Sequence, residues 1–227
     1  MWTIGELKAK GKAAMKANYG LTLVVSLIMG MITAGYGSSA GTNSEKLQEA
    51  ANENPDVMKL LVVIFGIVGV MVIIVKLIDI FVFNALEVGC KNFFLKNTEG
   101  PAALEELSRA FKPSWMNNVG TMFLRDVFLV GWTLLFIIPG FIKCYSYKMV
   151  PYILAEHPEM TGTEAITRSR EMMNGHKWRA FCLDLSFFGW ILLSLLTCGV
   201  LAVFYVNPYM HCTEAELYVA LKNEANT

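Results

Sequence analysis

Apolar runs alternate with polar segments along most of this chain. The first run extends from Leu21 to Ala34, and the longest begins at Val57 and continues to about Ala85. Four more runs follow, over about 119–138, about 141–155, about 180–197 and from the next turn to about Pro208. An apolar helix of about 20 residues can cross the hydrocarbon core of a bilayer. We therefore expect an all-α integral membrane protein with six transmembrane helices in three hairpins and a short tail helix after them.

The segment 1–18 has the pattern of a basic amphipathic helix. Thr3 and Glu6 have the spacing of a capping box, in which two side chains satisfy backbone N–H groups at a helix start. Lysines surround the apolar positions of this segment, a pattern typical of helices that lie on a membrane surface. We expect such an anchor here. A cleaved signal peptide is the alternative, but its charged region would be unusually long.

Two longer polar segments separate the later runs. Residues 86–117 form a mixed polar segment. In residues 156–179, Thr161 and Glu164 repeat the capping-box spacing, and Asn174-Gly175 supplies a helix stop. We expect a second amphipathic helix in this segment, also at the membrane surface.

The distribution of Lys and Arg predicts the orientation. The loop at 37–57 and its flank hold only Lys46 and Lys59, whereas four basic residues occur in each of three other segments, 1–18, 86–117 and 156–179. Segments rich in Lys and Arg stay in the cytoplasm. We therefore expect both termini to be cytoplasmic and the 37–57 loop to be extracytoplasmic.

An internal repeat relates the second and third hairpins, over 119–155 and 180–221. The sequence from Phe123 to Leu135 recurs from Phe181 to Leu193, and the two copies share Phe, Asp, Gly, Trp and two Leu positions. Each copy continues into a glycine-containing turn and a second apolar helix. Because glycine lets helices approach closely, we expect Gly131 and Gly189 to lie at helix contacts. A duplicated hairpin is the simplest interpretation.

Ionisable residues inside the apolar runs are the main candidates for chemistry. They are Lys76, Asp79, Arg125, Asp126, Lys148 and Asp184. Charged groups within a membrane are costly and usually face a partner or a water-filled cavity. One interpretation is a symmetric proton or cation site around Asp126 and Asp184. The other, which we favour, is a set of interhelical ion pairs that joins Asp126 to Lys76 and Asp184 to Lys148.

Basic residues in the segment 156–179 are candidates for binding lipid headgroups. They are Arg168, Arg170, Lys177 and Arg179. Basic side chains beside apolar ones at the cytoplasmic face suit anionic headgroups. The ordinary positive charge of cytoplasmic segments explains the same residues without a bound lipid.

The composition supports a membrane protein and narrows its chemistry. Hydrophobic residues make up 55% of the chain and charged residues only 17%, below the quarter that soluble domains usually carry. The formal net charge is zero, so nothing suggests a nucleic-acid partner. The cysteines and histidines lack metal-ligand spacing, and no catalytic or nucleotide-binding motif occurs. We therefore expect no catalytic residue, no cofactor and no metal.

Several motifs in the C-terminal half carry a resemblance to a known family. They are the run from Pro151 to Pro158, Glu164 to Ile166, Met173 to Lys177, Leu185 to Trp190, Gly199 and Pro208-Tyr209. Together they resemble the bacterial integral membrane family catalogued as domain of unknown function 975. The family is similar in layout to the membrane domain of some glycerophosphodiester phosphodiesterases, which carries no hydrolytic site. The resemblance implies a helical membrane fold in the bacterial cytoplasmic membrane, and it implies no activity.

These observations lead to ranked expectations for function. We expect a single multi-pass membrane domain, over 1–227, that is not an enzyme and binds a lipid, an amphiphile or a protein partner. The alternative is a small secondary transporter that uses Asp126 and Asp184 for coupling. An intramembrane enzyme is the least favoured class.

Overall fold

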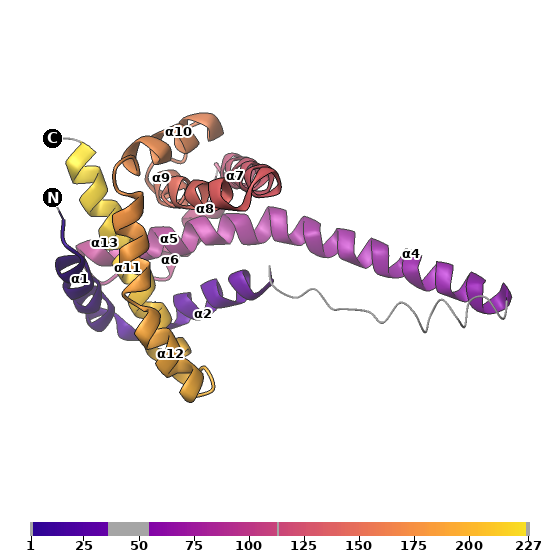
Figure 1. The fold of residues 1–227 in the computed structure, drawn as a ribbon, viewed down its shortest axis with the longest axis horizontal. Coiled ribbons are helices and arrows are strands. Elements are labelled where there is room, and N and C mark those ends of the chain that lie inside the picture. Colours follow the sequence, from indigo (N-terminus) through magenta and orange to yellow (C-terminus); the bar gives the residue numbers. More distant parts are fainter. Residues whose placement is uncertain (1, 36–54, 113, 226–227) are drawn as a thin grey trace.

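The computed structural model describes residues 2–35, 55–112 and 114–225, and every regular element in these ranges is helical (Figure 1). The helices form a central hub from which apolar arms extend. Four helices build most of the hub: α1 (Ile4–Ala17), α5 (Asn84–Glu99), α9 (Val150–Glu156) and α13 (Asn207–Ala225). Its buried core includes Phe93, Met149, Tyr152 and Tyr218. The two chain ends lie close together at one end of the molecule (Figure 1).

Three groups of helices extend from this hub. The first consists of α2 (Tyr19–Gly35) and α4 (Pro55–Ile78), and α4 is the long helix that runs along the longest axis of Figure 1. The second is the hairpin of α7 (Trp115–Leu135) and α8 (Ile137–Ser146). The third comprises α11 (Lys177–Leu185), α12 (Phe188–Leu196) and a π-helical stretch over Ala202–Val206. Short helices α6 (Glu105–Ser108) and α10 (Gly162–Met172), a 3₁₀ turn over Arg109–Phe111 and a π-helical stretch over Asp79–Phe83, between α4 and α5, complete the described elements.

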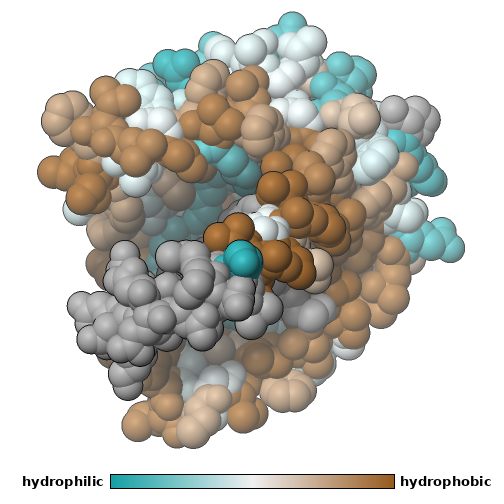
Figure 2. Space-filling view, turned by 90° about the vertical axis from the view of Figure 1, so that its right-hand side faces the viewer, coloured by the Kyte–Doolittle hydropathy of each residue, from teal (hydrophilic) through white to brown (hydrophobic). Residues whose placement is uncertain are grey.

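The arms expose their apolar side chains. Every described large side chain of α4 between Val62 and Ile78 is exposed, and Leu134, Ile137 and Leu196 at two hairpin ends are each 81% exposed. Seen from the end toward which α4 points, hydrophobic residues cover most of the surface and surround a recessed hydrophilic area (Figure 2). Contiguous apolar surface of this extent is typical of a face that binds a membrane, another protein or a ligand.

By length and hydropathy, one helix in the described ranges could cross a membrane, Lys177–Leu196. A second would qualify if α1 and residues 19–30, which are bent by 107°, formed one span. The expected all-helical fold is therefore confirmed, whereas the six crossings stay a prediction. The second helix of the middle hairpin, α8, has only 10 residues. At 1.5 Å per residue it is about 15 Å long, half of a hydrocarbon core.

Both predicted capping boxes are confirmed. The carboxylate of Glu6 accepts a hydrogen bond from the Thr3 backbone N–H at 3.2 Å and begins α1. Glu164 does the same for Thr161 at 3.1 Å and begins α10. The predicted stop after α10 is also present, because Gly175 has a φ of +78°, a conformation that glycine adopts without strain.

The N-terminal helix is not free to lie on a membrane surface, so that expectation was wrong. Its apolar face, which includes Leu7 and Met15, is buried in the hub against α13. At Gly11 the two helices approach so closely that a Cβ would lie 2.5 Å from the Thr213 Oγ1 atom. A small residue is therefore required there.

Two other segments also differ from expectation. The mixed polar segment that begins at residue 86 contains most of α5, whose side chains are largely buried in the hub. The chain passes Pro208 without a break, and α13 is a core helix rather than a tail. Because proline has no backbone N–H, Pro208 leaves the carbonyl four residues earlier, that of Phe204, without its helical hydrogen bond. This carbonyl lies in the π-helical stretch and accepts a hydrogen bond from the Tyr19 hydroxyl at 2.7 Å.

The glycines of the repeat do not lie at close contacts, so this prediction was wrong. A Cβ at Gly131 or Gly189 would meet no described atom within 4 Å. The close approach in the second hairpin occurs instead at Gly140, where a Cβ would lie 2.8 Å from the Thr133 Cα atom. The chain turns earlier than expected, at the extended residue Phe136, so that Gly140 lies within α8. The third hairpin turns where predicted, at Cys198 and Gly199, which both have positive φ.

Candidate functional site

An ionic network lies where α5, α11, α13 and the connection between α8 and α9 meet. Lys148, in that connection, donates to both carboxylate oxygens of Asp184 at 2.8 and 2.9 Å. Its Nζ atom also lies 3.2 Å from Glu214 on α13. Lys91 on α5 donates to the second oxygen of Glu214 at 2.6 Å. The Tyr145 hydroxyl donates to Asp184 at 3.0 Å. The network therefore joins two lysines and two acids from four parts of the chain.

Charge balance keeps this network stable in a largely buried place. The side chains of Lys91 and Glu214 are only 8% and 19% exposed. Burial alone would raise the pKa of Glu214, but attraction to Lys91 and Lys148 holds that pKa well below its ordinary value. Burial lowers the pKa of the neighbouring His211. The imidazole is therefore neutral at pH 7, and it stacks on Phe94 with ring centres 5.1 Å apart.

A second network joins α5 to α7. The guanidinium of Arg125 donates to both carboxylate oxygens of Glu87, at 3.1 and 3.3 Å. The same guanidinium lies 2.8 Å from the carboxylate of Asp126. A bidentate pair of this kind fixes the geometry of both partners. It attaches the arm of α7 to the central helix of the hub.

The repeated aspartates therefore have different partners. The predicted pair of Asp184 and Lys148 is confirmed. Asp126 pairs with its neighbour Arg125, whereas the side chains of Lys76 and Asp79 lie outside the described residues. Asp126 and Asp184 therefore belong to separate ionic networks, and no described side chain pairs with both of them.

The sequence interpretation missed residues that complete these networks. Glu87 and Lys91 lie four apart on α5, and His211 and Glu214 lie three apart on α13. Such spacings place side chains on one helix face and are a usable signal. The surrounding pattern does not single these residues out, because both segments have the polarity of surface helices.

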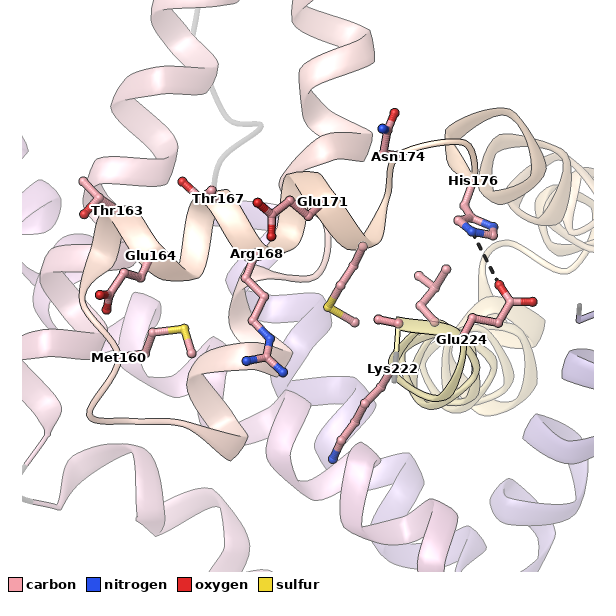
Figure 3. A pocket seen from close by; sticks show the side chains of 13 residues that line it. Met160, Thr163, Glu164, Thr167, Arg168, Glu171, Asn174, His176, Lys222 and Glu224 are labelled. Atoms are coloured by element: carbon pink, nitrogen blue, oxygen red, sulfur yellow. Dashed lines mark ion pairs between the residues drawn. The ribbon is translucent and has the colours of Figure 1, made fainter. Parts of the chain in front are cut away.

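A cleft of about 770 Å³ lies between α10 and the C-terminal end of α13 (Figure 3). Apolar side chains from Met160, Met172 and Leu221 line it together with charged ones. Glu224 pairs with His176 at 3.4 Å on one side of the cleft. The lining charges are Glu164, Arg168, Glu171, Lys222 and Glu224. The cleft is therefore amphipathic and carries both signs of charge.

The four predicted headgroup residues do not form one site. Arg168 lines the cleft. Arg179 lies over the Trp2 ring, 4.1 Å from its centre, and donates to the Trp2 carbonyl. Arg170 and Lys177 contribute to neither of these sites, and their charges act instead on Lys143 of α8.

No group of three or more His, Cys, Asp or Glu residues that could hold a metal ion occurs among the residues that the structure describes. A family model described as "Protein of unknown function (DUF975)" matches residues 57–225. No curated protein and no solved structure matches the chain.

Proposed function

Since this chain belongs to the DUF975 family, whose description assigns no activity, we propose a function from the geometry. The chain is a multi-pass membrane module that binds an anionic lipid or a similar amphiphile. It has no catalytic site of its own and requires no cofactor. Its location is the bacterial cytoplasmic membrane.

The observation that carries this proposal is the apolar surface of the arms. Exposed side chains such as Phe65 (58%), Ile73 (60%) and Leu134 (81%) could not stay in contact with water without large cost. A bilayer covers such a surface, while the ionic networks stay in the hub. Basic side chains near the hub then lie close to the level of the headgroups, where they attract anionic lipids.

The proposed topology has six crossings, with both termini in the cytoplasm and the 37–57 loop outside. The proximity of the two chain ends is compatible with this arrangement (Figure 1). Because α8 is short, the fourth crossing requires α8, the connection at 147–149 and α9 together.

A protein partner is the second candidate, and the cleft between α10 and α13 favours it. An open cleft of about 770 Å³ with methionines and charges of both signs suits a peptide segment better than a uniformly charged ligand. Transport through Asp126 and Asp184 receives less support, because each carboxylate already has a cation beside it. An intramembrane enzyme remains the least favoured proposal.

Two measurements test the main proposal. After an alkaline carbonate wash, the protein should stay in the membrane pellet, and its release into the supernatant would contradict the membrane assignment. Native mass spectrometry after gentle detergent extraction should then detect protein with a bound phospholipid in fixed stoichiometry. Protein without lipid, or a co-purified peptide chain in place of lipid, would favour the partner-binding alternative.

A further inference from the structure

A second large pocket, of about 700 Å³, lies between α1, the end of α5 and the C-terminal half of α13. It is separate from the cleft beside α10, and only Lys222 lines both. Three residues with short side chains line it on α1, namely Ala13, Ala14 and Ala17. Known sites for small molecules have volumes of about 300–1,000 Å³, so a ligand of that kind fits here. This space is called the α1–α13 pocket below.

Glu216 of α13 is an unpaired acid in this pocket. Lys91 and Glu216 are the two most buried charged residues whose exposure is described, at 6% and 8%. Lys91 has an ion pair, whereas the carboxylate of Glu216 forms no hydrogen bond or ion pair with any described residue. Lys10 also lines the pocket, but its side chain is exposed and does not pair with Glu216. Because a buried charge without a partner is costly, the carboxylate has the character of a vacant half of an ion pair.

The surroundings of Glu216 favour a cation as the missing partner. The last turns of α1 and α5 line the pocket, through Ala17 and Glu99 among others. Carbonyl groups at the C-terminus of a helix carry a partial negative charge that attracts cations. Three carboxylates and two lysines line the pocket, so its formal charge is negative as well. Glu99 and Glu156 have lysine partners, which leaves Glu216 to bind a ligand.

We propose that the α1–α13 pocket binds a primary alkylamine whose ammonium group pairs with Glu216. The ammonium supplies both the positive charge and the hydrogen-bond donors that this carboxylate lacks. The alkyl chain lies against Ala13, Ala14 and Val219. A soluble polyamine and the ethanolamine headgroup of a phospholipid both carry such an ammonium group. This inference goes beyond the proposed function, because it concerns a cationic group bound in the hub.

Other kinds of cation fit the pocket less well. Ca²⁺ takes about six to eight oxygen ligands, whereas a single carboxylate here lacks a lysine partner. A quaternary ammonium donates no hydrogen bond and is recognised by aromatic rings. The described residues that line the pocket include no aromatic side chain.

The test uses the full-length protein in detergent, stripped of lipid and titrated with spermidine in a calorimeter. The wild type should bind spermidine. Glu216→Gln keeps the shape of the side chain and should lower the affinity about tenfold or more, the effect of losing a hydrogen bond to a charged group. Glu105→Gln removes the same charge from an exposed position outside the pocket and should leave the affinity unchanged. Equal affinity of Glu216→Gln and the wild type would overturn the inference.

Two further variants test the location by different means. Ala13 is exposed on α1, so Ala13→Leu fills part of the pocket without disturbing the core, and it should weaken binding. Lys10→Gln removes a cation from the pocket wall and should strengthen binding, because like charges repel. Unchanged affinity in Ala13→Leu, or weaker binding in Lys10→Gln, would contradict the site.

Native mass spectrometry with phosphatidylethanolamine separates the two sources of the amine. Binding of spermidine that this lipid does not compete with assigns the site to a soluble amine. Binding of the lipid alone, lost in Glu216→Gln, assigns the site to the headgroup. If neither binds, the inference fails, while the proposed site for an anionic lipid is unaffected.

A measurement of stability separates loss of binding from loss of folding. Glu216→Gln removes a buried charge without a partner, so this variant should melt no lower than the wild type in the absence of ligand. Spermidine should raise the melting temperature of the wild type more than that of the variant. An equal rise in both proteins would show that spermidine binds elsewhere.

Discussion

At the scale of single residues, Glu214 determines how the hub is held together. Each of its two carboxylate oxygens pairs with one lysine, Lys91 from α5 and Lys148 from the connection before α9. Removing the acid leaves two lysines facing each other in a place with little solvent. A buried ion pair that loses one partner costs far more than an exposed pair does, because the remaining charge has no water to replace it.

Glu214→Gln should therefore lower stability strongly, by about 3–5 kcal/mol. The exposed pair of Lys96 and Glu99, which lies 3.1 Å apart on α5, supplies the control. Glu99→Gln should change stability by about 0–1 kcal/mol. Thermal unfolding in detergent measures both. Similar melting temperatures for the two variants would show that Glu214 does not hold the hub.

The dependence of stability on pH gives an independent check. Despite burial, Lys91 and Lys148 keep the pKa of Glu214 well below its unfolded value. Its contribution to stability is therefore complete above about pH 4.3, the ordinary value for Glu, and is lost as the pH falls through the folded-state pKa. The melting temperature of the wild type should fall below about pH 4.3, and that of Glu214→Gln should fall less over the same range.

Glu216 on the same helix should behave in the opposite way. Burial raises its pKa, and Lys10 opposes that rise only in part. The ionised form at pH 7 therefore weakens the fold, so Glu216→Gln should raise the melting temperature at pH 7 more than at pH 4. An identical pH profile for the Glu214 and Glu216 variants would contradict both assignments.

Among single residues, the sequence predicted the pair of Asp184 and Lys148 and missed the acid that shares this lysine. The aspartate stood out because it lies in an apolar run, where charge is costly. Glu214 lies in a segment with ordinary polarity, and only the packing of α13 into the hub buries it. Ion pairs between helices that are distant in the sequence depend on that packing, and the local sequence pattern does not show it.

At the scale of elements, α5 shows why polarity alone misleads. Its polar side chains suggested a surface segment, yet several of them have partners inside the hub. Asn97 donates to the Ala14 carbonyl at 2.9 Å and accepts from Asn18 at 3.0 Å. Asn92 donates to the carbonyl and the carboxylate of Glu106. Buried polar groups that are fully paired add specificity to a helix contact, so a polar helix can be the centre of a fold.

Elements with signals in their own sequence were predicted well. The capping boxes at Thr3 and Thr161 and the stop at Gly175 depend on neighbouring residues alone. By contrast, the packing of α1 and the presence of a close contact at a glycine depend on which helix lies against that position. For this reason Gly11 carries a close contact that no local pattern indicated, while Gly131 faces open space.

Gly11→Ala should separate α1 from α13. The new Cβ would lie 2.5 Å from the Thr213 Oγ1 atom and 2.8 Å from its backbone, so the helices must move apart. Overpacking of this kind costs about 1–3 kcal/mol. Gly5 lies on the same helix with no described atom near its Cβ position, and Gly5→Ala should be neutral or slightly stabilising. Equal melting temperatures for the two variants would contradict the close contact.

At the scale of the whole molecule, the fold separates two kinds of surface. The arms present apolar side chains outward, and the hub collects the ion pairs and paired amides. This separation matches the requirement that each polar group in a low-dielectric environment has a partner. The proposed orientation of the molecule in a membrane follows from it and can be measured with native cysteines.

Cys198 lies exposed at the turn of the third hairpin, which we propose to be extracytoplasmic. In a variant that keeps only this cysteine, a membrane-impermeant maleimide should label intact cells. A cysteine-free variant with Lys12→Cys should be labelled only after permeabilisation. Cys90 and Cys212 would give little signal, because burial raises the pKa of each thiol to about 12. Labelling of Cys198 only after permeabilisation would reverse the topology.

The packing of α1 against α13 also has a consequence for biosynthesis. The surface that covers Leu7 and Met15 is supplied by residues 207–225, about 200 positions later in the chain. At about 5–20 residues per second, the ribosome needs about 10–40 s to make that partner. All three arms are synthesised within this interval, so in the proposed topology they enter the membrane before the hub can close. A chain stalled before residue 207 would leave inserted arms attached to an open hub, a state that a membrane quality-control protease can distinguish from the finished protein.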